Sequence, residues 1–269
     1  MNIAETTNPR RAIPRRAVPA LASLPRPVYA RVENIRHRRE TRPHSHSWVQ
    51  LSYASRGVLQ IRTAGGLFLA PPQWAILVPP GLQHTVVNSA GTEMRSLYIE
   101  KSALPVTGGA CQVLAVSGLL REMIRHFSSL PAQYDEGGAE GRLVQVMLDL
   151  VQTAPREAFS LPWPAEPELI AICSAMLAAP QRPLRLADWS TVSGISARTL
   201  ERRFAQHTGM NLRQWRVRAR MLQSLPLLER GDSVTDVGLA CGYASTSSFI
   251  ASFRQFFGRT PGGFSAGER

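Results

Sequence analysis

The chain has 269 residues, of which 31 are Lys or Arg and 19 are Asp or Glu, and its formal net charge is +12. This length accommodates two domains, and a hydrophobic content of 44% is typical of globular domains with their own cores. No apolar run approaches the roughly 18 residues of a membrane-spanning helix, and three scattered cysteines argue against a disulfide framework. We therefore expect a cytoplasmic protein without a membrane partner, and the positive charge favours an anionic one.

Residues 1–27 are rich in proline and arginine and show no apolar period. This composition predicts a basic, disordered arm that is either solvated or in contact with DNA phosphates. Two Arg pairs in this arm are reminiscent of a twin-arginine export signal. The apolar stretch that follows is short and is interrupted by Pro19 and Pro25, so we expect no export.

Residues 28–153 are expected to form one domain, in which short strands are followed by two helices. Glycine and proline turns separate seven candidate strands, and such spacing predicts a sandwich or barrel. The candidate strands are 28–35, 48–54, 58–63, 67–70, 75–78, 85–88 and 94–100. From Gly118 the apolar period becomes helical, which predicts amphipathic helices over 119–127 and 143–151. These helices would pack on their own domain or on a second subunit as dimerisation helices.

Residues 154–167 contain four prolines and are predicted to be a linker to a helical domain over 168–269. This last domain contains an internal repeat, because segment 186–195 matches segment 234–243 in its apolar, acidic and glycine positions. Each copy reads as helix, glycine turn, helix, and a helix over 212–229 joins the copies. Pro226 should kink or split this joining helix, and Gly238 should weaken the first helix of the second copy.

The tandem repeat resembles the DNA-binding domain of the AraC family of transcription regulators. The resemblance rests on segments 196–204 and 248–261, and the latter is close to the family signature. It implies an α+β multidomain protein, with a cupin-like β-barrel and two helices before an all-α tandem helix-turn-helix domain. It also implies binding to double-stranded promoter or operator DNA within the nucleoid, homodimer formation and contact with RNA polymerase. One monomer would then span two successive major grooves, about 34 Å apart.

The resemblance places five residues of the first recognition helix at DNA: Arg198, Thr199, Glu201, Arg202 and Arg203. Arg198 and Arg202 are four positions apart and therefore share one helix face. Arginine at such positions favours guanine, and Glu201 is able to accept a hydrogen bond from a cytosine amino group. The sequence thus predicts base-specific reading by this helix.

In the second recognition helix, the positions that match are occupied by the short residues Thr246, Ser247 and Ala251, which predicts weaker base specificity. Arg254 and Arg259 are expected to bind phosphates. On the joining helix, a run of arginines is expected chiefly to face solvent: Arg213, Arg216, Arg218 and Arg220.

The β domain carries residues that resemble the two cupin motifs. His44 and His46 precede Gln50, which stands where those motifs usually have glutamate, and His84 belongs to the second motif. Period-two spacing puts His44 and His46 on one strand face, and a barrel would bring them to His84 and Gln50. Three imidazoles suit zinc, nickel, copper or iron, whereas Gln50 makes the site less anionic. A metal site, a metal-free effector pocket and a structural role all remain open.

Three functions follow from these observations. The first is a regulator, not an enzyme and without catalytic residues, whose barrel senses a small molecule or a metal. A similar subgroup of the family controls neighbouring efflux or transporter genes, which implies a xenobiotic effector. The second is a cupin metalloenzyme, a dioxygenase or isomerase, with a DNA-binding tail, although Gln50 argues against it. The third is an architectural DNA binder whose barrel only dimerises, but Arg198 and Arg202 together predict sequence preference.

Overall fold

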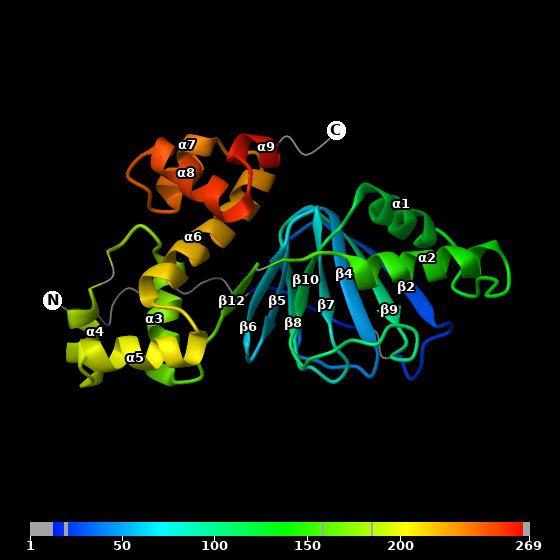
Figure 1. Cartoon of the computed structure of the whole chain (residues 1–269), viewed down its shortest axis with the longest axis horizontal. Helices are drawn as coiled ribbons and strands as arrows, with labels where there is room; N and C mark the ends of the chain where they lie inside the picture. Colours follow the sequence, from blue (N-terminus) through cyan, green and yellow to red (C-terminus); the bar gives the residue numbers. More distant parts are fainter. Residues whose placement is uncertain (1–12, 19–20, 158, 184, 266–269) are drawn as a thin grey trace.

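The computed structural model of the chain describes residues 13–18, 21–157, 159–183 and 185–265. A β domain covered by two helices lies beside a lobe made of helices (Figure 1). The mixed α+β architecture predicted from the sequence, with a β domain before a helical domain, is therefore confirmed. Residues 1–12 and 19–20 of the predicted arm lie outside the described residues.

The strands of the described chain form two six-stranded sheets. The first sheet has the order β1 (Arg15–Arg16), β3 (Arg39–Thr41), β8 (Thr85–Asn88), β5 (Leu59–Thr63), β6 (Gly66–Ala70) and β12 (Ser160–Pro162). The second has the order β11 (Arg156–Glu157), β10 (Gln112–Ala115), β7 (Trp74–Val78), β4 (Val49–Arg56), β9 (Thr92–Ile99) and β2 (Val28–Ile35). β1 and β3 pair in parallel, and the other pairings are antiparallel.

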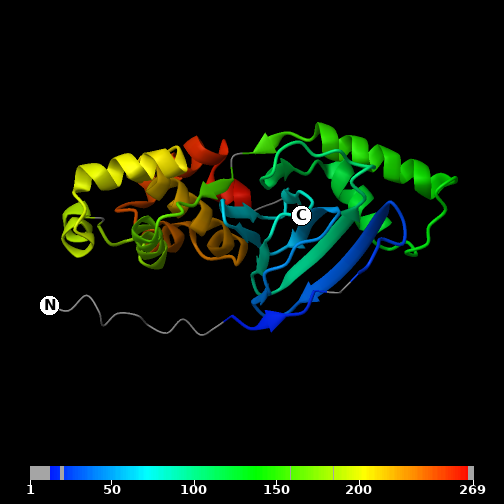
Figure 2. The same ribbon diagram turned by 90° about the horizontal axis from the view of Figure 1, so that it is seen from below.

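Alternation along the strands separates the core into two parts, because successive side chains point to opposite faces. On β4, Leu51 and Tyr53 face outward and pack against α1 (Gly118–Phe127) and α2 (Ala139–Thr153). Gln50, Ser52 and Ala54 alternate with them and face the other sheet. Figure 2 shows α1 and α2, in green, on one side of the β domain and the helical lobe beside it. The inner face is the one that can hold polar groups away from solvent.

The helical lobe contains two helix-turn-helix units joined by a long helix. Its helices are α3 (Pro167–Ala178), α4 (Leu186–Ser193), α5 (Ala197–Thr208), α6 (Leu212–Glu229), α7 (Val234–Ala240), α8 (Thr246–Phe257) and α9 (Pro261–Ser265). The turn glycines Gly194 and Gly242 have φ of +68° and +80°, the left-handed backbone for which glycine is suited. α6 runs unbroken through Pro226, so the predicted split does not occur.

Two predicted boundaries differ from the structure. The predicted linker 154–167 contains β11 and β12, which extend both sheets, and Leu161 within it is fully buried. The indole Nε1 of Trp215 on α6 donates a 2.7 Å hydrogen bond to the carbonyl of Pro162, so this segment packs against both lobes. In the predicted disordered arm, Arg15–Arg16 forms β1, and the Arg16 side chain is 9% exposed.

Candidate functional site

Helix α5 has one buried face and one charged, exposed face. Leu200 and Phe204 are fully buried, whereas Arg198, Glu201 and Arg202 are exposed. Ser196 begins the helix by accepting a hydrogen bond from the backbone N–H of Thr199, which satisfies one of the free N–H groups of the first turn. The buried face thus anchors the helix in the core, and the charged side chains project from its opposite face.

Arg203 and Thr199, in contrast, each have a partner within the chain. Arg203 Nη1 lies 3.2 Å from a carboxylate oxygen of Glu166, just before α3, and His207 Nε2 lies 2.9 Å from the other oxygen. The Thr199 hydroxyl lies 2.9 Å from that of Ser196. Sequence reasoning missed Glu166, because nothing in its local pattern indicates a partner 37 residues away.

Helix α8 is built in the same way, with Phe249 and Phe253 buried and Ser247, Ala251 and Arg254 exposed. Its N-cap Ser245 accepts from the backbone of Ser248. The Thr246 hydroxyl donates a 3.2 Å hydrogen bond to that of Thr235 on α7, so it braces the unit internally.

Arg259, a predicted phosphate ligand, lies at the β domain. Its guanidinium carbon is 4.8 Å from the ring centre of Trp74 on β7 and 5.0 Å from that of Phe264 on α9. The side chain is half-buried, and burial lowers the pKa of its guanidinium. In this arrangement the cation contacts aromatic faces of the chain itself.

Two arginines of α6 connect the two helix-turn-helix units. Arg216 and Arg220 each donate a 3.1 Å hydrogen bond to the carbonyl of Pro180, which follows α3. The Arg220 guanidinium carbon also lies 5.5 Å from the ring centre of Tyr243, beside the turn of the second unit. The expectation that this run of arginines mainly faces solvent is wrong for these two, because both donate to the carbonyl of Pro180, which is distant in sequence. It is also wrong for Arg218, which is half-buried with its guanidinium carbon 5.8 Å from the ring centre of Phe256.

Inside the β domain, the structure brings His44, His46 and His84 together. The backbones of His44 and His84 form a bridge with N–O distances of 3.0 and 2.9 Å. Their ring centres are 4.3 Å apart, and the ring centre of His46 is 5.1 Å from that of His84. Gln50 joins the cluster, with its amide oxygen 2.9 Å from Nε2 of His46 and its amide nitrogen donating to Ser52.

The environment of these imidazoles favours their neutral form. Burial lowers the pKa values of His44 and His46 and lowers the pKa of His84 to about 4. Each Nδ1 lies 2.8–2.9 Å from a backbone carbonyl oxygen, which fixes the orientation of the ring. Nε2 of His84 is buried and has no hydrogen-bond partner among the described residues.

The histidine cluster does not fit a divalent metal ion. Among the described residues, no three His, Cys, Asp or Glu side chains are arranged to hold one. Nε2 of His46 faces the amide oxygen of Gln50, and the carboxylate of Glu33, in the neighbouring network, is already bound by Arg16 and Arg31. The residues present thus form a neutral hydrogen-bonding cluster.

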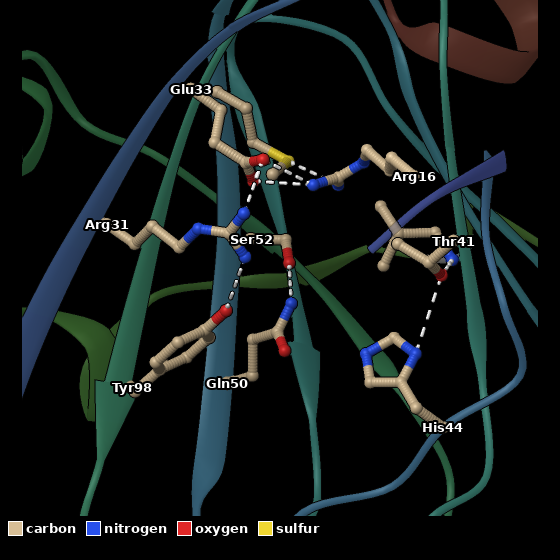
Figure 3. Close-up of polar contacts among 10 residues, drawn as sticks. Arg16, Arg31, Glu33, Thr41, His44, Gln50, Ser52 and Tyr98 are labelled. Carbon is tan, nitrogen blue, oxygen red and sulfur yellow. Dashed lines mark hydrogen bonds and ion pairs between the residues drawn. The ribbon is translucent and has the colours of Figure 1, made fainter. Parts of the chain in front are cut away.

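A charged network that sequence reasoning missed lies next to the histidines, and Figure 3 shows its side chains converging inside the β domain. Arg16 Nη1 lies 2.7 Å from one Glu33 oxygen, and Arg31 Nη2 lies 2.7 Å from the other. Arg31 Nη1 also donates to the hydroxyl of Tyr98 at 3.5 Å. Arg31 and Glu33 are two apart on β2 and therefore face the same way, which is the signal that the sequence offered.

Comparison with known proteins fits both lobes. Residues 26–147 match the AraC-like ligand binding domain, and residues 189–267 match a helix-turn-helix domain. The HTH-type transcriptional regulator NimR of Escherichia coli K12 is 31% identical over 223 residues, which are 83% of this chain and 81% of that protein. The chain belongs to the AraC family of transcription regulators. As in this family, the helical lobe is the DNA-binding domain and the β domain is the ligand-binding domain.

Two further relatives match a smaller part of the chain. The regulator RipA of Corynebacterium glutamicum is 33% identical over 107 residues, 40% of this chain and 32% of that protein. A solved DNA-binding domain of AdpA in complex with a target DNA is 30% identical and covers 36% of this chain and 87% of that one, with a TM-score of 0.33. The sequence relatives NimR and RipA are regulators, and the metalloenzyme alternative gains no support. In the described part of the chain, no helix combines the length and apolarity needed to cross a membrane.

Proposed function

We propose that this AraC-family chain is a ligand-gated regulator that reads DNA sequence mainly with α5 and senses a small molecule in a cupin-like β domain. The observation that carries the first half is the exposed cluster Arg198, Glu201 and Arg202 opposite a fully buried helix face. Guanidinium groups on one face suit guanine edges in the major groove. The short side chains of α8 leave the second unit to contribute mainly backbone contacts.

Contact between the lobes supports gating by the β domain. The rings of Trp74 and Phe264 stack at 6.0 Å, and Phe159 meets Phe257 at 5.1 Å. The backbone N–H of Gly57 donates a 3.1 Å hydrogen bond to Glu229 at the end of α6. A ligand that binds better to one arrangement of this contact would shift the population of DNA-binding-competent molecules.

The outer helices support the proposal of a homodimer. Leu119 on α1 is 60% exposed and Val146 on α2 is 48% exposed, so an apolar face is left for a second copy. Three further parts of the proposal rest on the family resemblance alone. They are a neighbouring efflux or transporter gene as the target, a xenobiotic as the effector, and contact with RNA polymerase.

The base-reading role is tested by Arg202→Ala on a site selected from random DNA. Loss of a bidentate contact to guanine should cost about 1–3 kcal/mol on that site and relax the preference at one base position, with little change on random DNA. Binding curves at constant salt, on the selected site and on single-base variants of it, measure both effects.

Arg203→Ala is the matched control, because Arg203 is adjacent in sequence but is paired with Glu166. This variant should keep the base preference of the wild type. Equal losses for Arg202→Ala on selected and random DNA would contradict a base-reading role.

A further inference from the structure

The interior of the β domain contains more positive than negative charge. Arg16, Arg31 and Glu33 meet there, with side chains only 9%, 19% and 16% exposed. Both guanidinium groups contact the single carboxylate. The next carboxylate along the strands, Glu40, belongs to a different group, where it pairs with Arg15 and Arg62. One positive charge of the Arg16–Arg31–Glu33 network is therefore left without a partner charge.

The neighbouring imidazoles do not change this balance, since burial keeps them neutral. The pKa of His44 is lowered first by burial and further by the nearby charges of Arg16 and Arg31. The histidines thus add uncharged hydrogen-bonding groups beside two cations. This environment repels a metal cation, in agreement with the poor fit described above.

An unmatched buried charge is costly, and so is a buried donor without an acceptor. Nε of Arg16 is buried and has no hydrogen-bond partner among the described residues, and the same is true of Nε1 of Trp48. Both groups are donors, so an acceptor is missing beside each of them, and a negative charge is missing from the Arg16–Arg31–Glu33 network. A carboxylate supplies both, and guanidinium is the side chain best shaped to bind it.

We propose that the β domain binds a small organic carboxylate that pairs with Arg16, which leaves Glu33 to Arg31. This inference rests on the proposed function, because it names the ligand class of the same sensing domain. With the ligand bound, two cations face two carboxylates, and the interior is neutral.

Aromatic side chains beside the arginines favour a carboxylate that carries a ring. Trp48 stacks on His46 with ring centres 5.2 Å apart and an angle of 3° between the ring planes. It also lies 5.6 Å from the ring centre of Tyr98, whose hydroxyl accepts a hydrogen bond from Arg31. Flat apolar faces next to guanidinium groups match the two parts of an aromatic acid.

The test measures binding of aromatic carboxylates and of their neutral amides to the full-length protein. Benzoate, phenylacetate and cinnamate are compared with benzamide, phenylacetamide and cinnamamide by thermal shift and calorimetry at constant ionic strength. We expect carboxylates to bind and to raise Tm, and the amides to bind at least tenfold more weakly. Added Zn²⁺, with EDTA as its control, is expected to give no stabilisation.

Three variants test whether Arg16 is the residue that binds the carboxylate. Arg16→Gln should weaken carboxylate binding about tenfold, equivalent to about 1.4 kcal/mol. Arg15→Gln is the matched control, because Arg15 is adjacent but 64% exposed, and it should bind as the wild type does. Glu33→Gln leaves two cations without a carboxylate and should bind carboxylates more tightly. Opposite effects from Arg16→Gln and Glu33→Gln cannot arise from a general loss of folding.

The proposal is overturned if none of the carboxylates binds at millimolar concentration, if Zn²⁺ stabilises the protein, or if Arg16→Gln and Glu33→Gln bind as the wild type does. Amides that bind as tightly as the acids would also overturn it, while the small-molecule sensor would stand. The proposed function is tested separately by DNA binding. It fails if the acids or amides that bind the protein leave its affinity for DNA unchanged.

Discussion

At the residue scale, His84 is a titratable side chain that is almost completely buried. It is 1% exposed, its Nδ1 lies 2.9 Å from the carbonyl oxygen of Leu82, and its Nε2 has no partner among the described residues. Burial lowers its pKa from 6.5 to about 4, with small contributions in the same direction from His44 and His46. The folded protein therefore holds this ring neutral at pH values where the unfolded chain protonates it.

This difference makes stability depend on pH. Above pH 6.5 both states leave His84 neutral, and its full contribution to stability is present. As pH falls from 6.5 towards 4, His84 becomes protonated in the unfolded chain but stays neutral in the folded one. The free energy of unfolding therefore decreases. The loss from His84 should reach about 3 kcal/mol at pH 4, and His44 and His46 add to it in the same direction.

Urea unfolding of the metal-free protein between pH 7 and pH 4 measures this dependence. His84→Gln should flatten the curve, because glutamine does not titrate. His126→Gln is the control, since His126 is exposed on α1, and it should leave the slope unchanged. A wild-type curve with the same slope as that of His84→Gln would show that the ring does not titrate differently on folding.

Some of the site could be predicted from the sequence, for physical reasons that differ between residues. The cupin motifs predicted that His44, His46 and His84 meet, but the strand periodicity invoked for His44 and His46 was wrong, since these residues lie between β3 and β4 and the backbone bridge of His44 to His84 brings the rings together. Arg16 and Glu33 were not found, because they are 17 residues apart and only the pairing of β1 with β3 brings Arg16 inside. Ion pairs between distant elements leave no local pattern.

At the element scale, the relative placement of the two helix-turn-helix units depends on the carbonyl of Pro180. The turn of the second unit packs closely here, because a Cβ on Gly242 would lie 2.6 Å from the Pro180 oxygen and from the Cα of Gln181. Gly194 occupies the same place in the turn of the first unit, and no described atom lies within 4 Å of the Cβ it would carry. The two glycines thus share a backbone conformation but not a steric environment.

Gly242→Ala should therefore cost more than Gly194→Ala. Both variants carry the strain of a left-handed alanine, roughly 1–2 kcal/mol. Gly242→Ala must also displace the Pro180 segment and the hydrogen bonds that Arg216 and Arg220 make to it. Urea unfolding measures the difference, and equal losses in the two variants would show that the contact at Pro180 is easily moved.

Elements with strong periodicity were predicted well, and those that depend on tertiary contacts were not. The repeat gave both helix-turn-helix units, and Thr85–Asn88 was predicted with its observed bounds. β12 was missed, since the prolines of segment 154–167 predict a linker, and its three residues become a strand only beside β6. Gly238 weakens α7 in isolation, but it lets Phe249 approach to within 3.1 Å of the Cβ position.

At the scale of the whole molecule, the two lobes share one apolar cluster that includes Ile76 of the β domain and Phe253 of α8. Arg259 lies at the edge of this cluster, between Trp74 and Phe264, and is at the same time a predicted phosphate ligand. Arg259 is half-buried between the β domain and α9 in this position, so we expect that it must leave the two rings to reach a DNA phosphate. The contact between lobes and the contact with DNA therefore compete for one side chain.

Trp74→Leu should release Arg259 and strengthen DNA binding. Leucine keeps an apolar side chain at a position that is 7% exposed, but it removes the ring that attracts the cation. One additional phosphate contact should steepen the salt dependence of binding, with the slope of log K against log salt changing by about 1. In an Arg259→Gln background, Trp74→Leu should have no such effect, because there is no cation to release.

Binding curves at several salt concentrations, with thermal unfolding to confirm the fold, measure this cycle. A Trp74→Leu slope equal to that of the wild type would mean that Arg259 stays at the β domain when DNA is bound, and the lobes would then move as one body.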